Sequence, residues 1–263
     1  MNIYCSLYKV KKMLNKVMEN FKKWKAIDFF WIALTTIIMI LASIILWDKT
    51  DNKISMLSLI GTVMGMINVI LVAKREVYMN IITAIIGEIA MGICYLHWNL
   101  LGNAVLNLAI FLPSNFAFIY WLKREKNNIV PTFRLNNKKR IILVIVTLAI
   151  TLLLGLIFAN INTSTPFIGD FLNADFYGGN NPMPYIDAFT LIANIIALVL
   201  MYLLYTEQWY LWVIVDVATL IIWIITATKS GSSSAIAYCV MYACWLINAV
   251  YGIKNWRKNQ QIK

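Results

Sequence analysis

A stripe of aromatic and polar side chains recurs at helical spacing in one apolar segment near the C-terminal end. Its members follow one another in steps of three or four residues: Trp209, Trp212, Asp216, Thr219 and Trp223. Residues at such intervals share one face of an α-helix. Indole rings stack on flat ligands and attract cations, and a carboxylate at membrane depth balances a positive charge. The stripe therefore indicates a binding site for a flat cation.

Four other apolar segments carry comparable stripes. Each stripe alone is more often a helix–helix contact than a ligand contact, but five together predict a polar, aromatic cavity between helices. The stripes comprise Asn68; Asn103, Asn107 and Ser114; Asp187, Thr190 and Asn194; and Tyr238, Tyr242, Trp245 and Asn248. With Glu88 as a further deep acid, the candidate substrate-binding residues are Trp209, Trp212, Asp216, Thr219, Asn194, Glu88, Asn107, Tyr242 and Asn248.

The sequence contains no recognisable metal or nucleotide motif. Its four cysteines form no C-x-x-C pair and it has one histidine, His97, so we expect no metal site, no cofactor and no catalytic residues. A G-x-x-x-x-G-K loop is missing, which argues against ATP hydrolysis by the chain. A carboxylate pair of Asp187 and Asp216 would be the basis of a membrane-embedded enzyme, the remote alternative.

The composition predicts an all-α integral membrane protein. Of 263 residues, 61% are hydrophobic and 13% are charged, about half the charged share of a soluble domain. A membrane-spanning helix needs roughly 20 apolar residues. About eight segments qualify, at 29–47, 54–73, 77–96, 100–122, 141–159, 185–205, 208–228 and 235–253.

The basic residues indicate how these segments are oriented. With eight spans, 20 of the 23 lysines and arginines fall on one side, and Lys49, Lys53 and Lys229 fall on the other. Basic residues accumulate on the cytoplasmic side. We therefore expect a multi-pass protein of the cell (inner) membrane with both termini in the cytoplasm. The net charge of +11 then reflects topology rather than nucleic-acid binding.

Two regions of the chain look like copies of one three-helix unit. Glu76 and Glu207 lie 131 residues apart, each in a short turn after an apolar segment, and Asn115 and Asn248 lie 133 apart before aromatic, basic exits. Three helices per copy and one connecting helix give a parallel 3+1+3 repeat, as in the SWEET transporters. The expected regions are a basic amphipathic arm (1–27), which would contact membrane lipids, an extra helix with its outer loop (28–53), the first repeat (54–126), a linker helix with a long outer loop (127–184), the second repeat (185–257) and a tail (258–263).

The segment WYLWVIVD, from Trp209 to Asp216, matches a Trp-x-x-Trp-x-x-x-Asn/Asp signature. On this segment, on PYIDAFT before the sixth span and on the aromatic, basic C-terminus, the chain resembles the PnuC family of nicotinamide riboside transporters over about residues 54–257. The resemblance implies a SWEET-like fold, a homo-trimer and facilitated diffusion, with a cytoplasmic kinase that traps the nucleoside for NAD synthesis. It also implies that Trp209, Trp212 and Asp216 bind substrate.

Alternatives stay open at this point. Relatives that share the fold carry thiamine or riboflavin, and thiamine is also a cation that Asp216 would accept. A membrane acid can also bind H⁺ or Na⁺, so ion-coupled transport is a further possibility.

Overall fold

The structure is a computed structural model, and it describes residues 3–47, 49, 52–97, 106–125, 130–160, 184–230, 233–258 and 260–262. Nearly all of these residues are helical, which confirms the expected all-α class. The helices are α1 (Ile3–Lys22), α2 (Ala26–Ile45), α3 (Asn52–Lys74), α4 (Tyr78–His97), α6 (Leu112–Ser114), α7 (Phe118–Arg124), α8 (Asn137–Asn160), α10 (Pro184–Tyr202), α11 (Gln208–Ser230) and α12 (Ser233–Arg257).

Each of the eight expected apolar segments contains helix. Three of the described helices, Ala26–Ile45, Asn52–Lys74 and Asn137–Ile157, are long and apolar enough to cross a membrane, and other described apolar stretches are shorter. The exact number of membrane spans therefore stays a prediction, as do the domain boundaries. The expected outer loop at 160–184 falls mainly on residues outside the described ranges.

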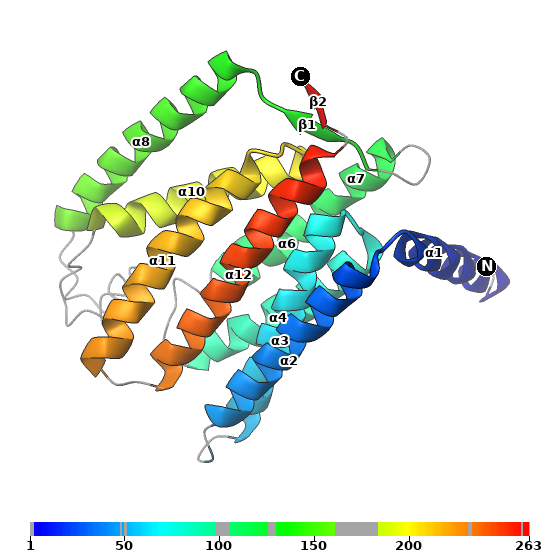
Figure 1. Ribbon diagram of the computed structural model, residues 1–263, viewed down its shortest axis with the longest axis horizontal. Helices are drawn as coiled ribbons and strands as arrows, with labels where there is room; N and C mark the ends of the chain where they lie inside the picture. Colours follow the sequence, from blue (N-terminus) through cyan, green and yellow to red (C-terminus); the bar gives the residue numbers. More distant parts are fainter. Residues whose placement is uncertain are drawn as a thin grey trace.

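The helices form one bundle with α1 projecting from it (Figure 1). Helices α2, α3 and α12 pack against one another, α3 packs along α4, and α11 packs along α12. Helix α8 lies outside this group against α10. Apolar side chains of α8 remain widely exposed, among them Ile145 at 59% and Leu153 at 61%. Such a surface is suited to lipid rather than water.

The fourth apolar segment is an irregular helix. It consists of a π-helical turn η1 (Leu106–Phe111), the single turn α6, a 3₁₀ turn η2 (Asn115–Ala117) and α7. Pro113 lies in α6 and has no backbone N–H to donate, so a regular ladder of hydrogen bonds cannot pass through this point. The length of the apolar run predicted one continuous span here, and the break departs from that prediction.

The turns that follow α3 and α10 have the same backbone geometry. After α3, Arg75 N–H donates to Val72 O (3.0 Å) and Glu76 N–H donates to Leu71 O (3.0 Å). This pair of bonds is a Schellman motif, and Arg75 occupies its left-handed position with φ of 59°. Most such motifs place glycine there, because other residues pay a steric cost of about 1–2 kcal/mol.

After α10 the same bonds recur. Leu204 N–H donates to Met201 O (3.0 Å), and Tyr205 N–H donates to Leu200 O (2.8 Å). Leu204 has φ of 66°, so a second non-glycine residue takes the left-handed position. The two turns thus share the same pair of backbone hydrogen bonds and the same left-handed position, although their side chains differ.

An aromatic cluster joins the two halves of the chain at the end that carries these turns. The rings of Trp121 and Trp256 meet edge to face with centroids 5.6 Å apart. Trp121 Nε1 donates to Tyr202 O at the end of α10 (3.1 Å), and Trp256 Nε1 donates to Val72 O near the end of α3 (3.2 Å). Helix α7 is therefore hydrogen-bonded to α10, and α12 is hydrogen-bonded to α3.

A short parallel sheet closes the same end. Strand β1 (Thr132–Arg134) pairs with β2 (Gln260–Ile262) beside the turn after α10 (Figure 1). Phe133 N–H donates to Leu204 O (2.8 Å), and Thr206 N–H donates to Phe133 O (3.0 Å). The connection between the halves therefore covers this turn with backbone hydrogen bonds.

Candidate functional site

The stripe predicted on α11 faces the inside of the bundle. Asp216 is 4% exposed and Trp209 is 3% exposed, whereas Val217 and Ile221, which point in other directions around the helix, are 40% and 52% exposed. The period of 3.6 residues separates these faces. The side chains on which the binding hypothesis depends thus point at other helices rather than outward.

Trp209 packs in the aromatic cluster. Its ring meets that of Trp256 edge to face with centroids 5.8 Å apart. Gly252 on α12 allows this approach, because a Cβ atom there would lie 2.5 Å from the indole ring of Trp209. The indole Nε1–H of Trp209 is buried without an acceptor among the described residues.

Trp212 lies one turn deeper and is only half-buried at the edge of the same cluster. Its Nε1 donates to Gln208 Oε1 over 3.4 Å, a long hydrogen bond. The Gln208 side chain is fully buried, and its Nε2 has no acceptor among the described residues. Trp212 is therefore the tryptophan of the signature whose ring is partly available for stacking.

Asp216 lies one further turn along α11 with no hydrogen-bond partner among the described residues. An ionised carboxylate in an apolar interior is costly unless a cation or hydrogen-bond donors compensate it. Thr219 follows at half-buried depth on the same face. The side chain of Trp223, the last member of the stripe, lies outside the described set.

Glu88 belongs to a different polar group, between α4 and the broken fourth segment. Its carboxylate accepts a hydrogen bond from the Asn115 side-chain amide, and Asn115 is 3% exposed. The neighbouring Ser114 hydroxyl lies 2.8 Å from that of Tyr202 on α10. The break at Pro113 thus positions two polar side chains that connect α4 with α10.

Asn248 and Tyr242 lie on the side of α12 that faces α2 and α3. Asn248 Nδ2 donates to Val69 O (3.1 Å), and its Oδ1 accepts a long bond from Trp31 Nε1 (3.5 Å). Tyr242 packs edge to face on Trp245 with centroids 5.3 Å apart. The Asn248 amide thus links three helices, a packing role that its position in the sequence did not reveal.

The other candidates are less informative. Asn194 on α10 donates to Thr190 O of its own helix (2.9 Å), and Asn107 lies half-buried in η1. Asn103 and the side chains of Asp187 and Tyr238 lie outside the described set.

The structure thus divides the candidates among three groups. Trp209, Trp212, Asp216 and Thr219 share one face of α11, Glu88 bonds to the fourth segment, and Tyr242 and Asn248 pack toward α2 and α3. One cavity among the described residues, beside the turn after α3, is lined by none of them. Whether these side chains bind a substrate stays a prediction.

The sequence did not single out three residues that bond to the candidates or to their neighbours: Asn115, Tyr202 and Gln208. Asn115 served only as a marker of the repeat, although an asparagine within an apolar helix already suggests a buried hydrogen bond. Tyr202 and Gln208 come at the ends of apolar segments, where polar residues are common and carry little signal.

Comparison with known proteins identifies the family. A family model described as nicotinamide mononucleotide transporter matches residues 55–258, which is more than half of the chain. The chain belongs to the nicotinamide mononucleotide transporter family. This family consists of transporters, so the expected transporter class is confirmed over the enzyme alternative. The family also makes the chain an integral membrane protein.

Individual members of the family align along most of the chain. The chain is 26% identical to the nicotinamide riboside transporter PnuC of Neisseria mucosa, over 95% of this chain and 90% of that protein. It is 28% identical to the protein of the same name from Haemophilus influenzae, over 89% of this chain and 91% of that one. The resemblance to PnuC transporters is thereby confirmed.

A solved structure has the same fold. The crystal structure of the vitamin B3 transporter PnuC superposes with a TM-score of 0.69 at 24% identity, covering 93% of this chain and 95% of that one. At this identity the match establishes the arrangement of the helices. It agrees with the nearly all-helical bundle described above.

Proposed function

We propose that this protein carries nicotinamide riboside across the membrane by facilitated diffusion. Two relatives that align along about nine tenths of the chain are named nicotinamide riboside transporters. The observation that carries the proposal is the Asp216 carboxylate, which is buried inside the bundle without a partner among the described residues. A cation that enters beside it would restore the electrostatic balance.

The chemistry of the substrate fits the neighbours of Asp216. Nicotinamide riboside joins a flat, positively charged pyridinium ring to a ribose with hydroxyl groups. The half-buried indole of Trp212 provides a face for stacking and cation–π attraction. Thr219, on the same side of α11, offers a hydroxyl for hydrogen bonding. The three side chains would thus recognise charge, ring and sugar separately.

The proposed architecture is eight membrane spans with a parallel 3+1+3 repeat after the extra helix α2. The matched Schellman turns at Arg75 and Leu204 support two equivalent units. The crossed hydrogen bonds of Trp121 and Trp256 support a two-fold relation between them. Transporters of this kind alternate access by moving one repeat against the other around a central site.

In the cell, the protein would lie in the inner membrane as a homo-trimer with both termini in the cytoplasm. The excess of lysine and arginine on one side supports this orientation. Facilitated diffusion only equalises concentrations, so net uptake needs a reaction that consumes the nucleoside inside. A cytoplasmic kinase that phosphorylates it, and so leads it toward NAD, would serve as that sink.

A binding titration of the purified protein tests the proposal. Nicotinamide riboside, thiamine and riboflavin are titrated separately against the wild type, Asp216→Asn and the outward-facing control Val217→Ala. We expect nicotinamide riboside to bind most tightly, with at least a tenfold loss in Asp216→Asn and no loss in Val217→Ala. Unchanged affinity in Asp216→Asn would remove the proposed site, and tighter binding of thiamine or riboflavin would reassign the substrate.

Uptake into proteoliposomes tests the mechanism. Facilitated diffusion predicts that labelled nicotinamide riboside equilibrates without any ion gradient and stops at equal concentrations. Uptake that requires a proton or sodium gradient would establish ion-coupled transport instead.

A further inference from the structure

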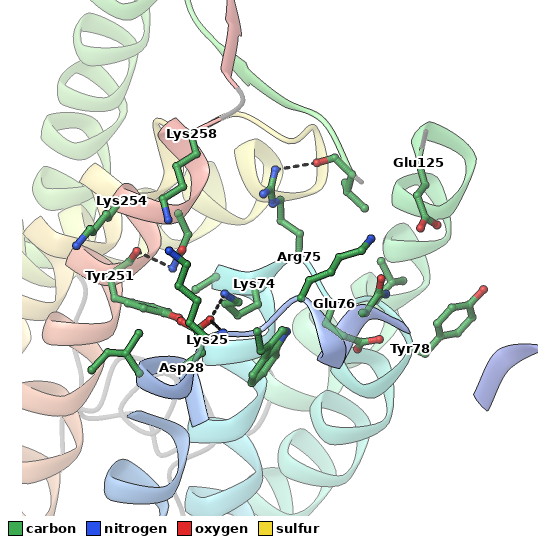
Figure 2. Close-up of a pocket in the computed structure, with 18 of the residues that line it drawn as sticks. Lys25, Asp28, Lys74, Arg75, Glu76, Tyr78, Glu125, Tyr251, Lys254 and Lys258 are labelled. Atoms are coloured by element: carbon green, nitrogen blue, oxygen red, sulfur yellow. Dashed lines mark hydrogen bonds and ion pairs between the residues drawn. The ribbon is translucent and has the colours of Figure 1, made fainter. Parts of the chain in front are cut away.

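A cavity of about 420 Å³ lies at the end of the bundle that carries most of the basic residues. Its walls come from the junction between α1 and α2, the turn after α3, the end of α7 and the end of α12. In Figure 2, Tyr251, Lys254 and Lys258 stand on one side, Tyr78 and Glu125 on the other, and Arg75 and Glu76 between them. No residue of the α11 stripe lines this cavity.

Two of the three carboxylates in the cavity wall are already neutralised. Asp28 pairs with the Lys74 ammonium and accepts hydrogen bonds from the Tyr251 hydroxyl and the Lys25 backbone N–H. Glu125 forms an ion pair with Lys16 of α1. Neither carboxylate therefore contributes an uncompensated negative charge.

The third carboxylate, Glu76, is buried and turned toward the start of α4. Its Oε2 accepts hydrogen bonds from Met79 N–H (2.7 Å) and Asn80 N–H (3.3 Å). Burial raises the pKa of Glu76, which favours its neutral form. Its Oε1 has no partner among the described residues. Glu76 therefore opposes an anion in the cavity only weakly, and it can donate a proton when neutral.

Four cations of the wall have no carboxylate partner among the described residues: Lys25, Arg75, Lys254 and Lys258. Arg75 is held firmly, because its backbone is fixed in the turn and one N–H donates to Val130 O (2.9 Å). A guanidinium has five N–H donors, so most of them are still available. Burial lowers the pKa of Arg75, the mark of a cation that has lost water without gaining an anion.

We propose that this cavity binds a phosphate group, carried either by an anionic lipid headgroup or by a soluble phosphate ester. A planar guanidinium and several ammonium groups around one space are the recognised donors for phosphate. The volume lies within the range of small-molecule sites, about 300–1,000 Å³.

The surroundings favour the lipid as the source. Ile27, which lines the cavity, and Phe30, one turn further along α2, are each 60% exposed, so apolar surface adjoins the basic wall. Basic pockets between membrane helices next to such surface bind anionic lipid headgroups. A soluble ester would need only the basic wall, so the two sources can be separated by experiment.

The test compares two double variants that remove the same charge. Lys254→Ala/Lys258→Ala changes the cavity wall, and Lys138→Ala/Lys139→Ala removes two exposed lysines at the start of α8, outside the cavity. Retention of dioleoylphosphatidylglycerol against dioleoylphosphatidylcholine is measured by native mass spectrometry. Inorganic phosphate is titrated by calorimetry in detergent at fixed ionic strength.

We expect the wild type and Lys138→Ala/Lys139→Ala to retain phosphatidylglycerol alike, and Lys254→Ala/Lys258→Ala to retain at least fivefold less. The same loss seen only with inorganic phosphate would support the proposal with a soluble ester as the source. The proposal is overturned if neither probe binds in preference to phosphatidylcholine or buffer, or if both double variants lose binding equally. Arg75→Gln, which keeps most of the side-chain length, should reproduce the loss.

Discussion

The turn after α3 and the turn after α10 share a backbone but have opposite surroundings. In both, a non-glycine residue takes the left-handed position of a Schellman motif, at φ of 59° and 66°. Leu204 of the second turn is 0% exposed and packs in the aromatic cluster. Arg75 of the first turn lines a basic cavity.

The difference arises from the linker between the two halves. Strand β1 crosses the second turn, where the N–H and the C=O of Phe133 both form hydrogen bonds. The described part of the linker reaches the first turn through the Arg75 bond to Val130 O. The turn after α10 is thus covered by backbone hydrogen bonds from the linker, and the turn after α3 borders a cavity. The same backbone geometry therefore packs inside the protein at one turn and borders a basic cavity at the other.

The largest effect is expected from breaking the ion pair of the covered turn. Glu207 Oε1 accepts hydrogen bonds from Arg140 Nε (2.8 Å) and Nη2 (2.6 Å) and from the Leu135 backbone N–H (3.2 Å). Glu207→Ala leaves a partly buried guanidinium unpaired, which we expect to cost about 3 kcal/mol. Unfolding in detergent, followed by circular dichroism, measures the loss. A loss below about 1 kcal/mol would show that the linker is not held here.

Leu204→Ala is expected to destabilise the same turn to a similar degree. Removing a fully buried leucine costs about 2–5 kcal/mol, and alanine does not relieve the left-handed strain. Leu203→Ala, at a neighbouring position that is 45% exposed, is the matched control. Equal stabilities of the two variants would contradict the packing role.

Glu76, in the turn after α3, should make the melting temperature of the protein depend on pH. Because burial raises its pKa in the folded protein, Glu76 favours folding at low pH, and this contribution is lost as the pH rises through the raised pKa. Glu76→Gln removes the titrating group and should flatten the fall in melting temperature above the ordinary glutamate pKa of about 4.3. The melting temperature is measured from pH 4 to 8. An unchanged slope would mean that Glu76 is ionised in the fold.

The smallest effect, and one of opposite sign, is expected for Arg75→Gly. Glycine adopts the left-handed conformation freely, so the substitution should stabilise the turn by up to about 1 kcal/mol. It should also reduce phosphate binding at the cavity. The two readouts therefore move apart: stability rises while affinity falls. Destabilisation by more than about 1 kcal/mol would show that Arg75 is mainly a packing residue.

Much of the helical framework could be predicted from the sequence, because apolar length and helical periodicity are local signals. The inward face of α11 followed from the spacing of Trp209, Trp212 and Asp216 alone. The left-handed conformations of Arg75 and Leu204 could not be predicted, because glycine usually marks such positions and neither residue is a glycine. The break in the fourth segment was signalled by Pro113, which the apolar run outweighed.

The sequence also could not predict that the candidate residues fall into three separate groups. Stripes on separate helices carry no information about which faces meet. Asn248 therefore looked equivalent to Asp216, although its amide bonds to α3. The basic cavity was missed because its cations come from three separate segments and served only to orient the chain.

The crossed indole bonds at Trp121 and Trp256 have a consequence for movement. If the halves part at this end, a pseudo-symmetric displacement pulls both donors from the carbonyls of Tyr202 and Val72 at the same time. Leaving two buried groups without partners costs roughly 2–6 kcal/mol in total. Parting at the far end disturbs neither bond. We therefore expect the conformer closed at the basic end to predominate. Spin-label distances across that end in Trp121→Phe/Trp256→Phe should show a larger share of the conformer that is open there.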